Sequence, residues 1–553
     1  MLKVSAHNAA LVLLAASLIF VVLFWRLGTP TFWDPDEAHY AETSREMIAT
    51  SDWSAPYYNE QPFFDKPVLF HQLQGTAMWL ISDPELGARL VPALAALGLL
   101  AITLWFGSVM LSRDVGIVAS LMLATCPAVF GLARYAILDT LFTLFLFGGA
   151  ACLAVAAIKN RPRLQWLGYI ALALAVQTKG PLALALCGLT MLLLVAVSAD
   201  LRRRLLALHW FIGLAVVIGM SAPWFIYMYL RFAEGFVNGY VLDENVRLFA
   251  ASRFANQPGF TFYLQILALA MLPWTGLLVG RLIDDARALR RGEKLDAIEV
   301  VLWTWTLAIV GFFTLSTFKL DHYVFPAAPS LCLLCARTWS DIRADRHAPR
   351  HRASLIGLYC IGPTLLAAGG VLGYLQVTRF DLPAGAMVMP ATLTLAGVVA
   401  VVGLAVRRAS LPRVPWLVTT VMLVMYAGVI QFVLPALEDH KVIPDLARWV
   451  STRAQPEDRV ASFRLNRWNP AYRFYVGRHI SFIDDPAEAE KYFRSPEPFY
   501  GVMRRSAYEE LAAQGVPLTI VHEREGMWAT SGRALWRSSA PLTGFVVVSN
   551  RRE

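Results

Sequence analysis

The chain has 553 residues, of which 57% are hydrophobic and only 16% are charged. This balance excludes an ordinary soluble globular protein and is typical of a protein that crosses a membrane many times. The net charge of +9 does not indicate nucleic-acid binding, because the basic residues are spread over separate short connections between apolar runs.

About thirteen apolar runs are each long enough for a helix that crosses a hydrocarbon layer roughly 30 Å thick. The first run has no small-residue cleavage site, so we interpret it as a retained anchor and not as a removed signal peptide. We therefore expect a polytopic α-helical membrane domain over residues 1–438. The runs are 9–26, 86–110, 113–131, 135–157, 163–177, 181–198, 207–230, 260–283, 297–318, 321–338, 353–376, 386–406 and 413–434.

Lys and Arg gather in every second connection along the chain, for example at 159–163, 202–204 and 287–294. Because connections of this kind stay on the cytoplasmic side of a membrane, we expect a cytoplasmic amino terminus. The loop 27–85 and the carboxyl-terminal segment 439–553 are then expected on the outer side.

The loop 27–85 is predicted to contain two helices. Asp34 is placed as the N-cap of the first helix, Pro35 as its first residue and Glu37 as the third position of a capping box. Pro67 opens the second helix, which is apolar but too short to span a membrane, so we expect it to lie along the membrane surface.

The composition changes at Asp439, where long apolar runs stop and charged residues become frequent. Short apolar segments there alternate with helical stretches, which is typical of a compact α/β domain. The expected strands are 460–463, 479–482, 518–521 and 542–548, and the expected helices are 484–493 and 506–514.

Three carboxylates, Asp34, Asp36 and Glu37, are crowded into one turn after the first span. Acids at a helix start satisfy free backbone amides and favour the helix dipole, and this account suffices for Asp34 and Glu37. It explains Asp36 less well, because like charges at close range cost energy unless a cation faces them. From these residues alone, a capping role and a functional role are equally open.

Charged residues also occur elsewhere on the expected outer side. Lys66 can bind a lipid phosphate as a point charge or only extend to ordinary head groups, and Asp65 beside it can pair with it or bind a cation. Asp139 lies near the outer end of a predicted span, where an ionisable group needs a partner. Arg134 is one candidate partner, and a cavity shared with Asp36 is the functional alternative.

Five further residues of the outer connections are candidate contacts for an anionic substrate: Lys179, Arg247, Arg253, Lys319 and Tyr323. Arginine offers a bidentate fork to phosphate, and the tyrosine hydroxyl offers a further hydrogen bond. The plain alternative for each residue is contact with bulk lipid head groups.

The sequence contains none of the common nucleotide-binding or zinc-hydrolase motifs. His39 and Asp65 are weak candidates for metal ligands, so a divalent metal is left open and no other cofactor is expected. The six cysteines lie within or beside predicted spans, and we interpret the CxxC pair Cys332 and Cys335 as buried packing and not as a zinc or redox site.

These motifs resemble the family C glycosyltransferases of the dolichyl-phosphate-mannose protein mannosyltransferase superfamily, which share an acidic motif after the first span, here DPDEAHYAE. The ordered set DEAHYAE, FFDKPVL, RYAILD, QTKGP and KLDHYVFP is similar to the bacterial transferases that add 4-amino-4-deoxy-L-arabinose to lipid A. The resemblance covers the whole membrane part. Two positions depart from that pattern, since Asp65 stands where we expect Glu and Val68 where we expect a second Pro.

The resemblance implies a GT-C fold and transfer of the amino sugar from undecaprenyl phosphate to lipid A phosphate, on the periplasmic side of the bacterial inner membrane. Resistance to polymyxin and cationic peptides would follow. No protein partner is expected. The implied catalytic residues are Asp36, Glu37 and Asp139, and the implied substrate contacts are Tyr40, Lys66, Lys179, Arg247, Arg253 and Tyr323.

Two other functions stay open at this stage. The same enzyme fold can serve a protein or another glycan as acceptor. Alternatively, a transporter of lipid-linked sugars would bind the head group through the same charges without cutting it. A transporter needs polar groups along a path through the bilayer, whereas the acids and bases singled out here gather at one face.

Overall fold

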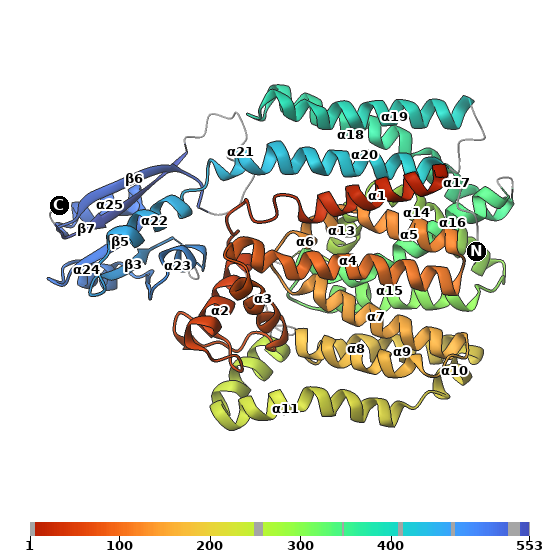
Figure 1. Ribbon diagram of the computed structural model, residues 1–553, viewed down its shortest axis with the longest axis horizontal. Helices are drawn as coiled ribbons and strands as arrows, with labels where there is room; N and C mark the ends of the chain where they lie inside the picture. Colours follow the sequence, from red (N-terminus) through yellow and green to blue (C-terminus); the bar gives the residue numbers. More distant parts are fainter. Residues whose placement is uncertain are drawn as a thin grey trace.

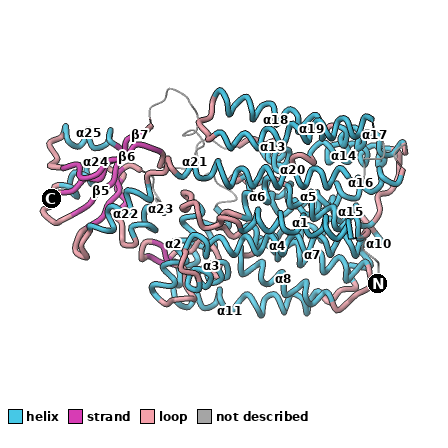
Figure 2. Tube along the Cα trace, turned by 45° about the horizontal axis from the view of Figure 1, so that its top comes forward, coloured by secondary structure: helices cyan, strands magenta, loops and turns pink. Residues whose placement is uncertain are grey.

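The computed structural model describes residues 6–247, 258–345, 348–406, 413–465, 470–528 and 542–551. It has two parts, a bundle of long helices and a smaller domain that contains a β-sheet (Figure 1). Figure 2 shows this sheet at one end of the elongated molecule, with helices filling the rest. The expected fold class, a helical membrane part followed by an α/β domain, is confirmed.

The bundle is built from helices, most of them strongly apolar. The α-helices are α1 (Ala6–Phe24), α4 (Pro84–Met110), α5 (Arg113–Thr125), α6 (Pro127–Ala133), α7 (Asp139–Ile158), α8 (Leu164–Lys179), α9 (Leu182–Val197), α10 (Ala199–Leu206), α11 (Trp210–Phe236), α13 (Phe262–Ala270), α14 (Thr275–Arg290), α15 (Ala297–Leu315), α16 (Ala328–Ala344), α17 (Arg352–Tyr359), α18 (Ile361–Thr378), α19 (Val388–Val406), α20 (Val414–Gly428) and α21 (Leu434–Glu438). Tighter or wider helical turns are η1 (Val237–Arg247), η2 (Asp321–Ala327), η3 (Pro349–His351), η4 (Ala384–Met387) and η6 (Val429–Val433).

Each predicted span corresponds to one of these helices or to a group of adjacent helical segments, but not all of them can cross a membrane alone. Within the described residues, seven helical segments are long and apolar enough to do so, and the number rises to eight if the bent pair α5 and α6 forms one span. The chain is thus a multi-pass membrane protein, and the count of thirteen spans stays a prediction.

Two predicted spans are interrupted beside a proline. The run 113–131 bends by 67° between α5 and α6, where Pro127 is the first residue of α6. The run 260–283 is split into α13 and α14, with Pro273 in the break. Proline has no backbone N–H and interrupts helical hydrogen bonding. Such irregular backbone is tolerated in a membrane protein where protein covers it or it lines a cavity, and both breaks border the larger cavity described below.

The loop 27–85 contains both predicted helices, but the predicted capping box is wrong. The first helix begins at Asp36 with Pro35 as its N-cap, and no side chain caps its first turn. The Asp34 carboxylate instead accepts a hydrogen bond from the backbone N–H of Ala471 at 2.8 Å. The second helix begins two residues after Pro67. The elements of the loop are α2 (Asp36–Thr50), the hairpin of β1 (Tyr57–Tyr58) and β2 (Gln61–Pro62), and α3 (Leu69–Leu80).

The described residues of the carboxyl-terminal domain form one sheet and four helices. Its elements are α22 (Ile443–Arg453), β3 (Arg459–Phe463), α23 (Pro470–Val476), β4 (Ser481–Ile483), α24 (Pro486–Phe493), β5 (Phe499–Arg504), α25 (Arg505–Ala513), β6 (Thr519–Gly526) and β7 (Thr543–Ser549). The strand order is β4-β3-β5-β7-β6, with β3 parallel to β4 and β5, and β7 antiparallel to β5 and β6. The four predicted strands overlap β3, β4, β6 and β7, whereas the central strand β5 was missed.

The basic connections lie together at one end of the bundle. Figure 1 places α10, α17 and the amino terminus at the end away from the sheet domain, as the alternation of basic connections predicts. The loop with α2 and α3 lies at the other end, beside the carboxyl-terminal domain. We call these the far end and the site end. Which of the two faces the cytoplasm stays a prediction.

Candidate functional site

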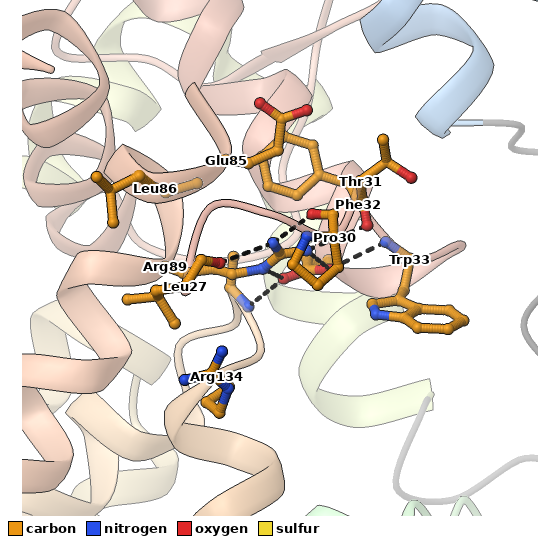
Figure 3. Close-up of polar contacts among 12 residues, drawn as sticks. Leu27, Pro30, Thr31, Phe32, Trp33, Glu85, Leu86, Arg89 and Arg134 are labelled. Atoms are coloured by element: carbon orange, nitrogen blue, oxygen red, sulfur yellow. Dashed lines mark hydrogen bonds and ion pairs between the residues drawn. The ribbon is translucent and has the colours of Figure 1, made fainter. Parts of the chain in front are cut away.

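Arg89 fixes the start of α2 and the turn before it to the bundle (Figure 3). Arg89 of α4 is 1% exposed and donates to both carboxylate oxygens of Glu37, with Nε–Oε1 at 2.6 Å and Nη2–Oε2 at 2.9 Å. The same guanidinium donates to backbone carbonyls of the turn 27–31. Glu37 also accepts from two backbone N–H groups. Glu37 was predicted to be catalytic. Its carboxylate oxygens bind groups inside the protein, so Glu37 holds the loop in place.

Asp36, the first residue of α2, faces a cavity of about 570 Å³. Most of the wall is apolar and comes from α6, α13 and η2, while its charged part consists of Asp36, Asp321 and His322. Burial raises the pKa of Asp36, His322 opposes this rise, and the nearby carboxylates of Asp139 and Asp65 add to it. Because Asp36 has no hydrogen-bond or ion-pair partner within the part of the chain that is described, it is available to a substrate in this cavity.

Asp139 begins α7 and is 4% exposed. Its carboxylate forms an ion pair with Nζ of Lys179, the last residue of α8, and its second oxygen lies 3.7 Å from Nε2 of His322. Arg134, the partner considered from the sequence, donates instead to backbone carbonyls near the end of α1. Asp139 is thus linked to the cavity of Asp36 through His322.

Lys66 lies between two carboxylates. Its Nζ is 2.6 Å from Oδ1 of Asp65 and 3.3 Å from Oε2 of Glu244. Burial alone would lower the pKa of Lys66, but the two carboxylates outweigh it and raise that pKa. Burial alone would raise the pKa of Asp65, but the charge of Lys66 outweighs this effect and holds that pKa below its usual range. Lys66 and Asp65 are therefore both ionised near neutral pH.

A second, small cavity of about 100 Å³ has Lys66, Lys179, Tyr240 and Tyr323 in its wall, together with the two carboxylates that pair with Lys66, Asp65 and Glu244. The Nζ of Lys179 lies 4.9 Å from the centre of the Tyr323 ring. Tyr323 borders the small cavity and its neighbour His322 borders the large one, so the two cavities adjoin across η2. Two lysines and two phenols in one wall are suited to an anion such as phosphate.

The remaining predicted substrate contacts, Tyr40, Arg247 and Arg253, differ in their surroundings. The Tyr40 ring stacks on His71 at 5.5 Å, and the carboxylates of Asp65, Asp139 and Asp36 lie near enough to add to the rise that burial causes in its pKa. It therefore stands within the site. Arg247 pairs with Asp243 at 2.5 Å, and its side chain is 65% exposed. Arg253 lies outside the described residues.

The weak metal candidates do not form a metal centre. His39 packs against the Tyr58 and Phe63 rings, and burial lowers its pKa to about 4, so it is neutral at pH 7. Asp65 is paired with Lys66. Within the described ranges, no three His, Cys, Asp or Glu side chains are grouped so as to hold a metal. Cys332 and Cys335 are fully buried, as expected for packing. A metal requirement stays untested.

Four residues of the site were not singled out from the sequence: Tyr240, Glu244, Asp321 and His322. His322 stands beside Tyr323 in the KLDHYVFP motif, so its position was marked although its contact with Asp139 was not. Tyr240 and Glu244 belong to the outer connection 231–259, in which the sequence analysis singles out only basic residues. The signal that points to Glu244 is the need of Lys66 for a nearby acid that neutralises its charge.

Sequence comparisons find that part of the chain is similar to known transferases. Residues 13–236 match the family model described as dolichyl-phosphate-mannose-protein mannosyltransferase. A relative from Edwardsiella ictaluri, described as undecaprenyl phosphate-alpha-4-amino-4-deoxy-L-arabinose arabinosyl transferase, is 31% identical over 368 residues, or 65% of this chain and 64% of the relative. One of the same description from Aeromonas salmonicida is 29% identical over 62% of this chain and 64% of the relative. The chain thus spans about 64% of the length of these relatives.

Solved structures share the fold over nearly the whole chain. The crystal structure of ArnT from Cupriavidus metallidurans bound to undecaprenyl phosphate has a TM-score of 0.75 at 23% identity and covers 99% of both chains. The oligosaccharyltransferase of Archaeoglobus fulgidus has a TM-score of 0.51 at 11% identity over 94% of this chain and 70% of that one. The expected GT-C fold is therefore confirmed.

Proposed function

We propose that this chain, which has the GT-C fold, is a glycosyltransferase that moves 4-amino-4-deoxy-L-arabinose from undecaprenyl phosphate to a phosphate of lipid A. In this reaction the bond between the sugar C1 and the carrier phosphate breaks, and a bond forms between C1 and an oxygen of the acceptor phosphate. The donor and the transferred sugar in this proposal are those that the descriptions of the curated relatives name, whereas the lipid A acceptor rests on the resemblance of the sequence motifs.

The observation that carries the proposal is the position of the buried Lys179 and the partly buried Lys66 beside a carboxylate, Asp36, that has no partner in the described residues. Lys66 and Lys179 line the small cavity, and Asp36 faces the larger cavity on the other side of η2. Negative charge develops on the carrier phosphate as the sugar leaves, and fixed cations that meet this charge lower the barrier. A phosphate that binds Lys66 competes with Asp65 and Glu244, so the lysine can release it again after transfer.

Asp36 is proposed to orient the substrates and not to act as an obligatory base. A phosphate monoester has a second pKa of about 6, so the acceptor oxygen is already ionised near neutral pH and needs little deprotonation. The amino sugar carries an ammonium group instead. Asp36, with Asp321 in the same wall and Asp139 behind His322, offers carboxylates that attract such a group.

A transporter is less well supported than a transferase. The long helices α7 and α15 carry their ionisable residues, Asp139 and Glu299, only in the first turn, and the rest of each helix is uncharged. In α4 the charges of Glu85 and Arg89 are likewise confined to the first two turns. A path for a charged head group through the bilayer would need polar groups at intermediate depth.

The proposed location is the bacterial inner membrane with the site end in the periplasm. The Lys- and Arg-rich connections at the far end favour a cytoplasmic position for that end, and lipid-linked donor and lipid A would both reach the two cavities from the opposite leaflet. Modification of lipid A at this face would lower its negative charge and give resistance to polymyxin and cationic peptides.

Mass spectrometry of lipid A tests the proposal. Cells that lack their own transferase but make the lipid-linked donor are given this chain, its Lys66→Ala variant or no protein. An added aminoarabinose mass with the unaltered chain alone is the expected result. If the correctly inserted chain leaves lipid A unchanged, the proposed reaction is wrong; appearance of the sugar on a protein or another glycan would then identify a different acceptor.

A further inference from the structure

The helix that carries Asp36 is held from two sides. On the membrane side, Arg89 forms an ion pair with Glu37. On the opposite side, α23 of the carboxyl-terminal domain lies against α2 and the residues that precede it. Ala471 at the start of α23 donates its backbone N–H to Asp34 at 2.8 Å, and the hydroxyl of Tyr475 accepts the backbone N–H of Phe32 at 2.8 Å.

Arg473 is the centre of this second contact. It is 2% exposed, its Nε lies 3.1 Å from Oε1 of Glu42, and its Nη2 lies 3.0 Å from Oε1 of Glu46. Glu42 and Glu46 are one turn apart on the same face of α2, and both are buried. Arg45 also pairs with Glu42, and Glu46 accepts from the backbone N–H groups of Asn59 and Glu60.

Removal of the Arg473 charge would leave two carboxylates of α2 in a buried position with reduced compensation. Buried carboxylates without a cation are strongly unfavourable, and the structure relaxes by hydrating them. For Glu42 and Glu46, hydration requires α2 to separate from α23. Such a movement displaces the first residue of α2, Asp36, which is in turn the residue that faces the larger cavity.

We propose that the carboxyl-terminal domain positions the site through α23, with Arg473 as the positioning residue for Asp36. Arg473 lines neither cavity described above, so it acts on the reaction through α2 and not by touching substrate. The inference rests on the proposed function in that Asp36 is taken to contact substrate. The carboxyl-terminal domain is then part of the catalytic unit and not a separate appendage.

The test compares three variants of the purified full-length protein with wild type. Arg473→Gln removes the charge, and Arg473→Lys keeps it. Arg464→Gln is the matched control, because Arg464 lies in the same domain and pairs with Glu510 at 2.7 Å where both side chains are well exposed. Binding of undecaprenyl phosphate gives the number of intact sites, and kcat and the donor KM are measured per intact site.

For Arg473→Gln we expect kcat per intact site to fall about tenfold or more, since small misplacement of a substrate-orienting group has effects of this size. The donor KM should stay within about twofold, because Lys66 and Lys179 are undisturbed. Arg473→Lys should recover part of the loss and Arg464→Gln should resemble wild type. An unchanged kcat per intact site, or a loss of sites that fully accounts for the lost activity, overturns the proposal.

Hydrogen exchange separates this inference from the proposed reaction. Amides of α2 should exchange faster in Arg473→Gln than in wild type or in Arg464→Gln, while amides of α7 should not change. If wild type shows no transfer at all, the proposed function fails, and exchange alone decides the positioning role. Unchanged exchange in α2 would overturn that role whatever the activity.

Discussion

Two clusters of buried charge in the membrane part differ in what surrounds them. The far-end cluster is centred on Arg281, which is 1% exposed. Its guanidinium pairs with Asp285 at 2.7 Å and with Glu299, and donates to the Thr338 hydroxyl at 3.3 Å. Arg337 adds a further cation near Glu299 at 3.5 Å. None of these residues lines either cavity of the site end.

The site-end cluster consists of Asp36, Lys66, Asp139, Lys179 and His322. Asp139 and Lys179 are buried and paired, while Asp36, Lys66 and His322 are partly buried. All of them except Asp139 line one of two adjoining cavities, and Asp36 has no partner in the described chain. Burial and pairing therefore do not mark a functional site by themselves. A charged side chain that faces a cavity and has no partner within the protein does mark such a site, because it is free to interact with a ligand.

The largest effect expected from this comparison is on stability at the far end. Arg281→Met should destabilise the protein by about 3–5 kcal/mol, because it leaves the buried carboxylates of Asp285 and Glu299 with too little positive charge. Thermal unfolding in detergent measures this loss. Transfer per folded molecule should be unchanged. The exposed pair of Arg291 and Glu293, which directly follows the same helix, α14, provides the control, since Arg291→Gln should leave the unfolding temperature near that of wild type.

Asp36→Asn should have the opposite effect: transfer activity should fall and stability should not. It removes the charge that faces the larger cavity while keeping the shape of the side chain, so transfer should fall about 10²-fold or more and the unfolding temperature should stay near that of wild type. Initial rates with lipid-linked donor and lipid A measure the effect. Asp200→Asn, in an exposed pair at the far end, is the control. Full activity of a folded Asp36→Asn protein would contradict the assigned role.

Lys66→Ala should weaken both donor use and binding of undecaprenyl phosphate. Loss of one charge-assisted contact and the repulsion from Asp65 and Glu244 should together lower kcat/KM about 10- to 100-fold. Direct binding of undecaprenyl phosphate, measured beside the kinetics, shows whether the loss is in phosphate recognition. Lys159→Ala, an exposed lysine at the far end, should leave both quantities unchanged; equal binding by Lys66→Ala would remove Lys66 from the phosphate site.

The smallest effect concerns the pH dependence of stability. Burial raises the pKa of Asp34 to about 7, above its usual 3.8, so the folded state binds its proton more tightly than the unfolded state. The stability that this proton contributes is present below about pH 4 and is lost as pH rises towards about 7. Between pH 6 and 8 the loss should be about 1.4 kcal/mol.

Asp34→Asn should remove this part of the pH dependence. The amide oxygen can still accept the hydrogen bond from Ala471, so the variant keeps the contact and loses only the titration. Thermal unfolding of both proteins at pH 6 and 8 measures the difference. Parallel pH profiles for wild type and variant would show that Asp34 is ionised throughout this range.

The sequence alone located most of the site end but assigned some roles incorrectly. Asp36, Lys66, Asp139, Lys179 and Tyr323 were singled out, and the structure brings them together around two cavities. The capping roles of Asp34 and Glu37 failed because both side chains find partners distant in sequence, Ala471 and Arg89. Local pattern favours the nearest free amide and has no access to such competitors.

The missed strand β5 has a similar cause. Its residues Phe499–Arg504 form a short, mostly buried segment, with five of six residues buried, and lack the alternation that marks a half-exposed strand. Its central place follows from pairing with β3 and β7. The edge strand β6 and the terminal strand β7 were predicted with shorter or slightly shifted bounds, because a register is set by the neighbouring strand and not by the segment itself.

What the sequence determined by itself is the membrane character of residues 1–438, the helical segments, and the end of the bundle at which the acidic and lysine motifs lie. These properties depend on the composition of short windows, since burial of apolar surface and helix formation are local in the chain. Only the tertiary structure decided which charge meets which: Lys179 with Asp139, Glu244 with Lys66, and Arg473 with the two glutamates of α2. The physical reason is that the strength of an ion pair depends on distance and burial in space, and no local pattern fixes the distance between residues that lie 40 or more positions apart.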